Sequence, residues 1–293
     1  MFWWRLCPVG CVALGLLVLS GCGQQSSVPN RDGAAVIRVE GSDTMVMVAQ
    51  AWAEEYHKKR PAISVQVLGG GSGVGIASLI DGNCDLADTS RKMTDTELQR
   101  VKAKRGTEAK EFVVGYDALA VYVHKDNPLD EITIEQLAEI YGDGGKITKW
   151  SQLGAKISGS DEIVRVSRQN SSGTYAYFRE AILGPKRDYK LQSIDQSGSK
   201  DVVALVSKTP GSIGYSGMGY KTPDVKMLRI AKHPGEASIA PTLENAKKGL
   251  YPITRPLQIY TVGEPLGAAK QYLDWIMAAE GQRIVLEEGY IPL

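Results

Sequence analysis

Four short turns in the sequence combine glycine or aspartate with the hydroxyl side chains of serine and threonine. They are Gly41-Ser42-Asp43-Thr44, Gly71-Ser72-Gly73, Asp88-Thr89-Ser90-Arg91 and Ser171-Ser172-Gly173-Thr174. Three of them lie where a strand is expected to lead directly into a helix. A helix start carries unpaired backbone N–H groups and the positive end of the helix dipole, and a hydroxyl adds a further donor. Such turns can hold an anion with little net protein charge.

Each turn has a simpler interpretation when it is taken alone. Ser, Thr and Asp are common helix N-caps, and glycine is a common turn residue. Four turns of this kind, two of them accompanied by arginine, are harder to explain by capping. Arg168 and Arg91 could each donate two hydrogen bonds to a tetrahedral anion. Arg91 precedes Lys92, however, and could equally be a surface cation.

The spacing of apolar residues predicts the elements that position the first three turns. Strand-like runs at 35–39, 63–68 and 85–87 alternate with helical patterns. The first helical pattern covers 45–56, and a capping box at Thr94 opens a later one. Alternating strands and helices predict a mostly parallel sheet that is covered by helices.

The same order recurs further along the chain. A strand-like run at 163–167 leads through the fourth turn into a helix that contains Tyr177 and Ile182. Between the two parts lie strand-like runs at 112–115 and 118–124, which are nearly continuous. Further elements are expected at 133–141, 201–207, 211–215, 257–262, 268–279 and 281–288.

The composition is that of a globular protein. At roughly 150 residues per domain, 293 residues predict about two domains. An apolar share of 43% and a charged share of 23% rule out a long disordered chain. The 34 Lys and Arg residues nearly balance 33 Asp and Glu residues, so no nucleic-acid partner is expected.

The first residues have the pattern of a bacterial export signal. Arg5 precedes an apolar run that is short for a membrane-spanning helix. Leu19-Ser20-Gly21-Cys22 resembles a lipobox, whose cysteine is acylated after cleavage. We therefore predict a signal peptide over 1–21 and a flexible polar tether over 22–33 that holds the protein to a membrane. The alternative is an ordinary signal peptide in which Cys22 is incidental.

The pattern of chemically reactive residues does not favour an enzyme. His57, His124 and His233 are scattered and lack the spacing of metal ligands. After signal cleavage and acylation one free thiol remains, Cys84, for which a buried apolar role is expected. The serine of the second turn has no identifiable histidine partner and no Gly-x-Ser-x-Gly motif. We expect no metal, no cofactor and no catalytic activity.

The four turns resemble those of a known family, the PstS-type phosphate-binding lipoproteins of phosphate ABC importers. The most specific match is Arg168 followed by Ser172-Gly173-Thr174 at a helix start. The first three turns match the other anion loops of the family, the third in a variant that ends in Ser-Arg. Residues 115–121 resemble the family's hinge strand, and 212–215 resemble its Gly-Ile-Gly-Tyr segment. The resemblance runs from about Val36 to the C-terminus.

The resemblance implies an α/β fold of the type II periplasmic-binding-protein kind. In that fold two lobes, joined by hinge strands, close on a ligand in the interlobe cleft. Carried over, residues 34–123 plus 232–293 form lobe I, and residues 124–231 form lobe II. The residues implied to bind phosphate are Ser42, Thr44, Ser72, Ser90, Arg91, Arg168, Ser172, Gly173 and Thr174.

One position departs from the family pattern. Some members carry an Asp in the third turn, which accepts a hydrogen bond from protonated phosphate and repels sulfate. Ser90 occupies that place here, so Asp43, Asp88 or Asp117 could supply the acceptor. Asp43 could instead cap its helix, and Asp117 could only orient an arginine.

The resemblance predicts a binding protein that delivers inorganic phosphate to the permease subunits of an ABC importer. We expect it to be exported, monomeric and anchored by a lipid on Cys22 to the bacterial cell membrane. The alternatives are a binder of another oxyanion, such as sulfate, molybdate or tungstate, and a lipoprotein that senses phosphate without transport. An exported phosphate-ester hydrolase is the least favoured alternative.

Overall fold

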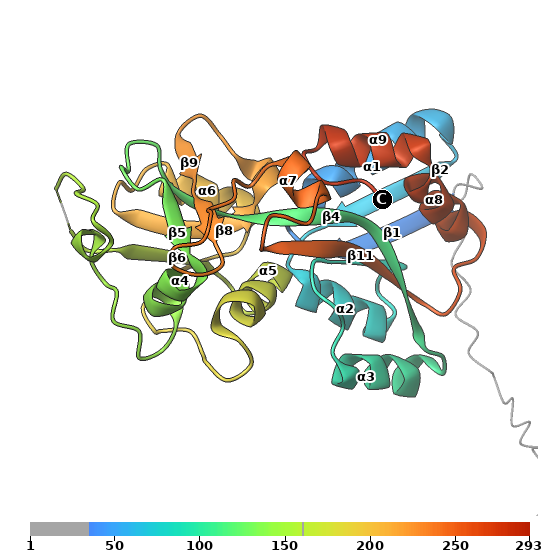
Figure 1. Cartoon of the computed structure of the whole chain (residues 1–293). Coiled ribbons are helices and arrows are strands. Elements are labelled where there is room, and N and C mark those ends of the chain that lie inside the picture. The colour runs from blue at the N-terminus through green and yellow to red at the C-terminus, as the bar shows by residue number, and fades with distance from the viewer. Residues whose placement is uncertain (1–34, 160) are drawn as a thin grey trace, which may run out of the picture.

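The computed structural model describes residues 35–159 and 161–293 (Figure 1). The predicted signal peptide, the tether and Cys22 lie outside the described residues. Within the described residues, no helix combines the length and the apolar character needed to cross a membrane.

The first part of the chain alternates strands and helices as predicted. Its elements are β1 (Ala35–Gly41), α1 (Val46–Lys59), β2 (Ile63–Leu68), α2 (Ser72–Asp81), β3 (Leu86–Thr89) and α3 (Asp95–Arg105). β1 pairs in parallel with both β2 and β3. Thr94 forms the predicted capping box with Glu97 at the start of α3.

The two strand-like runs in the middle of the chain form one strand, β4 (Ala109–His124). The first part of β4 pairs antiparallel with β11 (Thr254–Val262). Its last part pairs antiparallel with β8 (Ser212–Gly217) and β9 (Val225–Met227). In Figure 1 the strand runs through both parts of the molecule and joins them.

The rest of the chain adds further strands and helices. They are β5 (Glu131–Thr133), α4 (Ile134–Tyr141), β6 (Val164–Arg168), α5 (Gly173–Phe178), β7 (Ile194–Gln196), α6 (Ser199–Val206), β10 (Arg229–Ala231), α7 (Leu243–Lys247), α8 (Gly267–Met277) and α9 (Ala279–Glu287). β6 pairs in parallel with β7 and β8, and α4 begins with a capping box formed by Thr133 and Gln136. The strands β5, β7, β9 and β10 and the helix α7 are too short to leave a clear periodic pattern in the sequence.

The main sheet is mixed: the predicted parallel pairing is confirmed for β1, β2 and β3, but it does not hold for the sheet as a whole. Its strand order among the described residues is β2-β1-β3-β11-β4-β8-β6-β7, with β9 also paired to β4. Pairing is parallel at both ends and antiparallel around β11 and β4. The alternation of elements did not reveal this because β11 comes from the C-terminal part of the chain and enters between β3 and β4.

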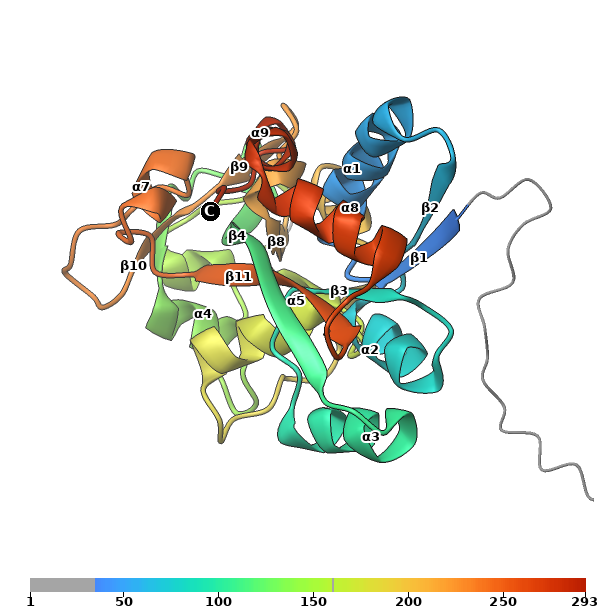
Figure 2. The ribbon, with the colours of Figure 1, turned by 90° about the vertical axis from the view of Figure 1, so that its right-hand side faces the viewer.

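Apolar side chains form separate cores in the two parts of the molecule that β4 connects. We call the part of the molecule built on β1, β2, β3 and β11 the first unit, and the part built on β6, β7 and β8 the second unit. In the first unit, α1 and α8 pack on one face of β1, β3 and β11, and α2 and α3 pack on the other face (Figure 2). The second unit surrounds a core that includes Trp150, Phe178 and Tyr215. β4 contributes Val114 to the first core and Ala118 to the second.

Candidate anion-binding site

Three serine hydroxyls from the first unit meet at one point. Ser42 Oγ donates to Ser90 Oγ at 3.0 Å, and Ser72 Oγ lies 3.4 Å from Ser90 Oγ. The backbone N–H of Ser90 donates to Ser72 Oγ at 3.0 Å. All three side chains are buried. They meet because β1, β2 and β3 are parallel and their carboxyl ends lie at the same edge of the sheet.

Two threonine hydroxyls join the two units beside this point. Thr44 Oγ1, just before α1, lies 2.9 Å from Thr174 Oγ1 in the first turn of α5. The neighbouring Gly173 faces the serine cluster directly. A Cβ on Gly173 would lie 2.3 Å from Ser72 Oγ and 2.6 Å from Ser90 Oγ. A larger residue would therefore push the two units apart at this contact.

The cap geometry separates hydroxyls that serve a helix from hydroxyls that face the cluster. The helices that follow Thr44 and Gly71 have no side-chain cap, so neither the Thr44 nor the Ser72 hydroxyl is used for capping. Ser172 behaves differently, because its Oγ accepts from the backbone N–H of Thr174 at 3.1 Å. Capping therefore explains Ser172 but not Thr44 or Ser72.

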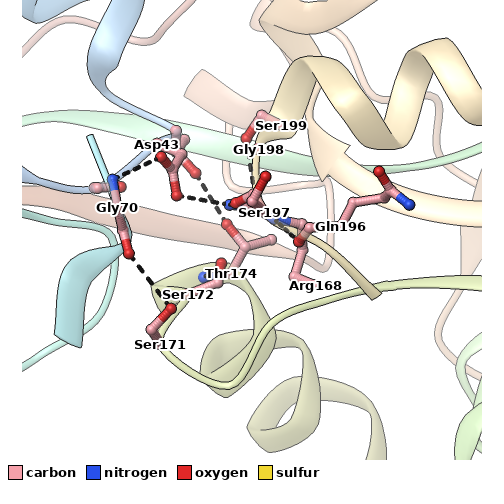
Figure 3. Close-up of polar contacts among 12 residues, drawn as sticks. Asp43, Gly70, Arg168, Ser171, Ser172, Thr174, Gln196, Ser197, Gly198 and Ser199 are labelled. Carbon is pink, nitrogen blue, oxygen red and sulfur yellow. Dashed lines mark hydrogen bonds and ion pairs between the residues drawn. The ribbon is translucent and has the colours of Figure 1, made fainter. Parts of the chain in front are cut away.

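Arg168 is fully buried at the end of β6, where it meets Asp43 and the segment 196–199 (Figure 3). Its Nη2 donates to Asp43 Oδ2 at 3.0 Å and to the Ser197 carbonyl at 2.7 Å. Its Nη1 donates to Ser199 Oγ at 3.0 Å. Burial lowers the pKa of this guanidinium, and Asp43 acts in the opposite direction. The group stays charged because arginine titrates far above neutral pH.

Asp43 connects the first and second turns with Arg168. Its Oδ1 accepts from the backbone N–H of Gly70 at 2.9 Å, and its Oδ2 accepts from Arg168. No side chain caps α1, so the interpretation of Asp43 as a helix cap was wrong. The carboxylate instead orients an arginine of the other unit (Figure 3).

Arg91 is turned toward α3. Its Nη1 and Nη2 donate to the two carboxylate oxygens of Glu97 at 2.8 Å and 2.7 Å. Its Nη2 also lies 3.8 Å from the place that a Cβ on Gly73 would take, so it borders the second turn. A direct contact of Arg91 with an anion stays a prediction, because Glu97 competes for the same donors.

Sequence reasoning missed Arg255, a second buried arginine at the site. Arg255 on β11 is the cross-strand partner of Asp117 on β4. Its Nη2 donates to Asp117 Oδ2 at 2.9 Å, to Thr44 Oγ1 at 3.1 Å and to Thr174 Oγ1 at 2.9 Å. The available signal was a pair of opposite charges next to strand-like runs, with Asp117 between 112–115 and 118–124 and Arg255 just before 257–262. That signal does not show which two strands pair.

The two arginines and their two aspartates make the site nearly neutral. Asp117 is fully buried, and burial raises the pKa of its carboxyl, while Arg255 acts in the opposite direction. Asp117 thus orients an arginine, as one of the sequence alternatives proposed. Because each guanidinium already has a carboxylate partner, an anion would be held mainly by hydroxyl and N–H donors.

Asp88, the third candidate acceptor, has no arginine. It is buried on β3, and its Oδ1 has no partner among the described residues. Burial raises the pKa of Asp88 to about 8, so the carboxyl is mostly neutral at pH 7. A charge on Asp88 would raise the pKa of Tyr272, which lies in the first core on the side of the sheet that α8 covers.

Metal and thiol chemistry find no support in the described residues. Across residues 35–159 and 161–293, no three His, Cys, Asp or Glu side chains gather in a way that could hold a metal ion. Cys84 is a buried free thiol, and burial raises its pKa to about 12. It is therefore not a thiolate at neutral pH.

Comparison with known proteins identifies the family. A family model for the PBP superfamily domain matches residues 26–280. The phosphate-binding protein PstS of Pseudomonas aeruginosa is 38% identical over 264 residues, which cover 86% of this chain and 81% of that protein. The chain belongs to the PstS family. PstS of Bacillus subtilis is 30% identical over 293 residues and covers 96% of this chain and 92% of its own length.

Solved structures agree with this PstS assignment. An X-ray structure from Clostridium perfringens, described as a phosphate ABC transporter substrate-binding protein with bound phosphate, has a TM-score of 0.78 and 29% identity. It covers 88% of this chain and 99% of its own. An ABC-type phosphate transport receptor from Vibrio cholerae has a TM-score of 0.69 and 27% identity, with 88% and 100% covered. These matches confirm the predicted family and the two-lobe α/β fold.

Proposed function

We propose that this PstS-family protein is an exported solute-binding protein, not an enzyme, that captures inorganic phosphate and delivers it to an ABC importer. The observation that carries the proposal is the meeting of hydroxyls from both units around Gly173. Relatives that bind phosphate support it, as does the resemblance of all four turns to the family's anion loops.

The proposed site consists mainly of serine and threonine hydroxyls, whose protons can rotate. The hydroxyls of Ser42, Ser72 and Ser90 bond to one another, and those of Thr44 and Thr174 form a second pair. Each hydroxyl can rotate its proton toward an entering oxyanion. Hydrogen bonds to a charged group contribute about 1.5–3 kcal/mol each, so several together can hold a phosphate.

We also propose that the two lobes close on the ligand, with lobe I at 34–123 plus 232–293 and lobe II at 124–231. Three contacts at the site cross this boundary, and Ala118–Val123, Tyr251 and Ile253 of the proposed lobe I pack in the core of the second unit. The backbone N–H of Gly73 donates to the Ser171 carbonyl at 2.9 Å, and the Tyr220 hydroxyl donates to the Thr44 carbonyl at 2.9 Å. The Arg168–Asp43 ion pair crosses the same boundary. Opening of the lobes would break all three contacts together and expose the hydroxyls.

The test of phosphate capture is calorimetric titration of the purified protein with phosphate, sulfate and molybdate. We expect tight phosphate binding and much weaker binding of the other two anions. Equal binding of sulfate would favour a general oxyanion binder, and no heat with phosphate would contradict the proposal. A chromogenic phosphate ester, incubated with the same sample, tests for hydrolysis, which we do not expect.

Membrane attachment through Cys22 and a monomeric state are further parts of the proposal. The lipobox and the polar residues that follow it support the membrane attachment. Cys22→Ser should release the protein from the membrane fraction and leave its phosphate affinity unchanged. Equal incorporation of labelled palmitate into Cys22→Ser and wild type would show that another residue carries the lipid. Sedimentation of the released protein tests the monomer.

A further inference from the structure

Arg255 lies where the chain passes between the two lobes. It is paired across the sheet with Asp117, between the β4 residues Val114 and Ala118, which belong to different cores. On its own strand, Leu257 packs in the first core, and Ile253 just before the strand packs in the second. The side chain of Arg255 therefore starts from the strands that connect the lobes, and not from the four turns.

The two terminal nitrogens of Arg255 have different numbers of hydrogen-bond acceptors. Its Nη2 carries two hydrogens but has three acceptors within reach, namely Asp117 and the hydroxyls of Thr44 and Thr174. Either hydroxyl can therefore turn away without leaving an Nη2 hydrogen unpaired. Its Nη1 donates to the Ser90 carbonyl at 3.2 Å, which is its one acceptor among the described residues.

The two threonine hydroxyls are in direct contact with this cation. Each accepts from Arg255, and one donates to the other across 2.9 Å, so the remaining hydroxyl proton is available to a ligand. A hydroxyl that accepts from a cation becomes a stronger donor, because successive hydrogen bonds polarise one another. Thr44 belongs to the first unit and Thr174 to the second, so this arrangement needs both lobes in contact.

The contacts of Arg255 exceed what a structural ion pair requires. Its Nε and Nη2 both donate to Asp117 Oδ2, which makes a complete ion pair, while Asp117 Oδ1 has no hydrogen-bond partner among the described residues. The guanidinium also lies 5.6 Å from the ring centroid of Tyr177, which helps to fix its plane. The additional bonds to Thr44 and Thr174 reach hydroxyls that cap no helix.

We infer that Arg255 is a positioning residue of the anion site. From the strands that connect the lobes, it orders and polarises the Thr44 and Thr174 hydroxyls for a tetrahedral oxyanion. Phosphate binding and lobe closure are thereby coupled through one guanidinium. The inference rests on the proposed function, because it assigns Arg255 to the proposed phosphate site.

Calorimetric titration of the full protein with inorganic phosphate tests this role. Arg255→Met should raise the Kd by at least about 100-fold, as expected for the loss of a charge-assisted network. Arg255→Lys keeps the charge but not the fork, so its Kd should rise by about 10-fold. The matched control is Arg229→Met on β10, which removes an exposed ion pair with Glu131 and should leave the Kd unchanged.

Folding is checked separately because Arg255→Met leaves Asp117 buried without its partner. The double variant Arg255→Met/Asp117→Asn removes both charges and should fold, as judged by circular dichroism. Its phosphate Kd should still rise by at least about 100-fold, because the cation behind the threonines is missing. A folded double variant with wild-type affinity would overturn the inference.

A double-mutant cycle distinguishes positioning from mere structural support. In a Thr174→Val background, Arg255→Met should raise the Kd by a factor at least about 3-fold smaller than in wild type, because part of its path to the ligand is gone. Equal factors in both backgrounds would show that Arg255 does not act through Thr174. If wild type itself fails to bind phosphate, the proposed function fails, whereas normal binding by wild type and both arginine variants rejects only the inference.

Discussion

Two buried arginines each pair with an aspartate, but the two pairs are placed differently in the chain. Arg255 and Asp117 are cross-strand neighbours, with side chains 1% and 0% exposed. Arg168 and Asp43 come from different units, and the Asp43 side chain is 17% exposed. The first pair can persist while the lobes move, and the second must break when they separate. One pair therefore supports the fold around the hinge, and the other depends on closure.

The largest expected difference between the pairs is in stability. Asp117→Ala leaves a buried guanidinium without its carboxylate, so it should lower the free energy of unfolding by about 3–5 kcal/mol. Asp43→Ala should lower it by no more than about 1 kcal/mol, because separation of the proposed lobes would let water reach Arg168 and replace the lost carboxylate. Urea unfolding monitored by circular dichroism measures both, and equal losses would contradict the distinction.

Arg168→Ala should show the opposite balance, with a large effect on binding and a small effect on folding. Loss of this buried, charged donor at the lobe boundary should weaken phosphate binding by about 2–4 kcal/mol. Titration calorimetry measures the affinity, and an unchanged circular dichroism spectrum shows that the fold is intact. Wild-type affinity in a folded variant would remove Arg168 from the site.

Asp88 sharpens the comparison because it is a buried carboxyl without an arginine. Its pKa is raised to about 8, whereas an unfolded aspartate titrates near 3.9. Between these values the unfolded chain has lost the proton and the folded chain has kept it. The contribution of Asp88 to the free energy of unfolding is therefore fully present below about pH 4, and it is lost as the pH rises from there through about 8.

The pH effect should be roughly 1 kcal/mol per pH unit between pH 5 and pH 8. Asp88→Asn cannot ionise, so the difference in unfolding free energy between Asn and wild type should grow with pH. Urea unfolding of both proteins at pH 5, 6.5 and 8 measures that difference. A constant difference across the three pH values would show that Asp88 does not titrate in this range.

The smallest effect should come from Asp43→Asn, which keeps an acceptor for Gly70 and removes the charge beside Arg168. We expect a loss of about 1 kcal/mol in phosphate affinity. Small-angle scattering should still show a smaller radius of gyration with phosphate than without it, but the change should need more ligand.

The same variant tests anion selectivity when it is compared with Asp117→Asn. If the charge of Asp43 or Asp117 repels sulfate, the corresponding Asn variant should narrow the gap between phosphate and sulfate affinity. A gap that stays unchanged in both variants would exclude these carboxylates as the selective groups.

Local sequence was enough to predict the parts that depend on near neighbours. The capping boxes at Thr94 and Thr133 form within one helical turn, so three or four residues determine them. The anion-site turns were visible for a similar reason, since each combines hydroxyls with a strand end or a helix start. The resemblance to the PstS family extended this to the lobes and to the expected ligand, because the order and spacing of the turns are specific to that family.

Tertiary structure alone decided which distant residues share the site. β11 enters the sheet between β3 and β4, and this places Arg255 beside Asp117 and behind Thr44. Arg91 had the charge and the sequence position expected of a site residue, yet the packing of α3 gives it Glu97 as a partner. Such outcomes depend on pairings across more than a hundred residues or on competition between partners. Residue types and local spacing determine which groups are available, and strand order determines which of them meet.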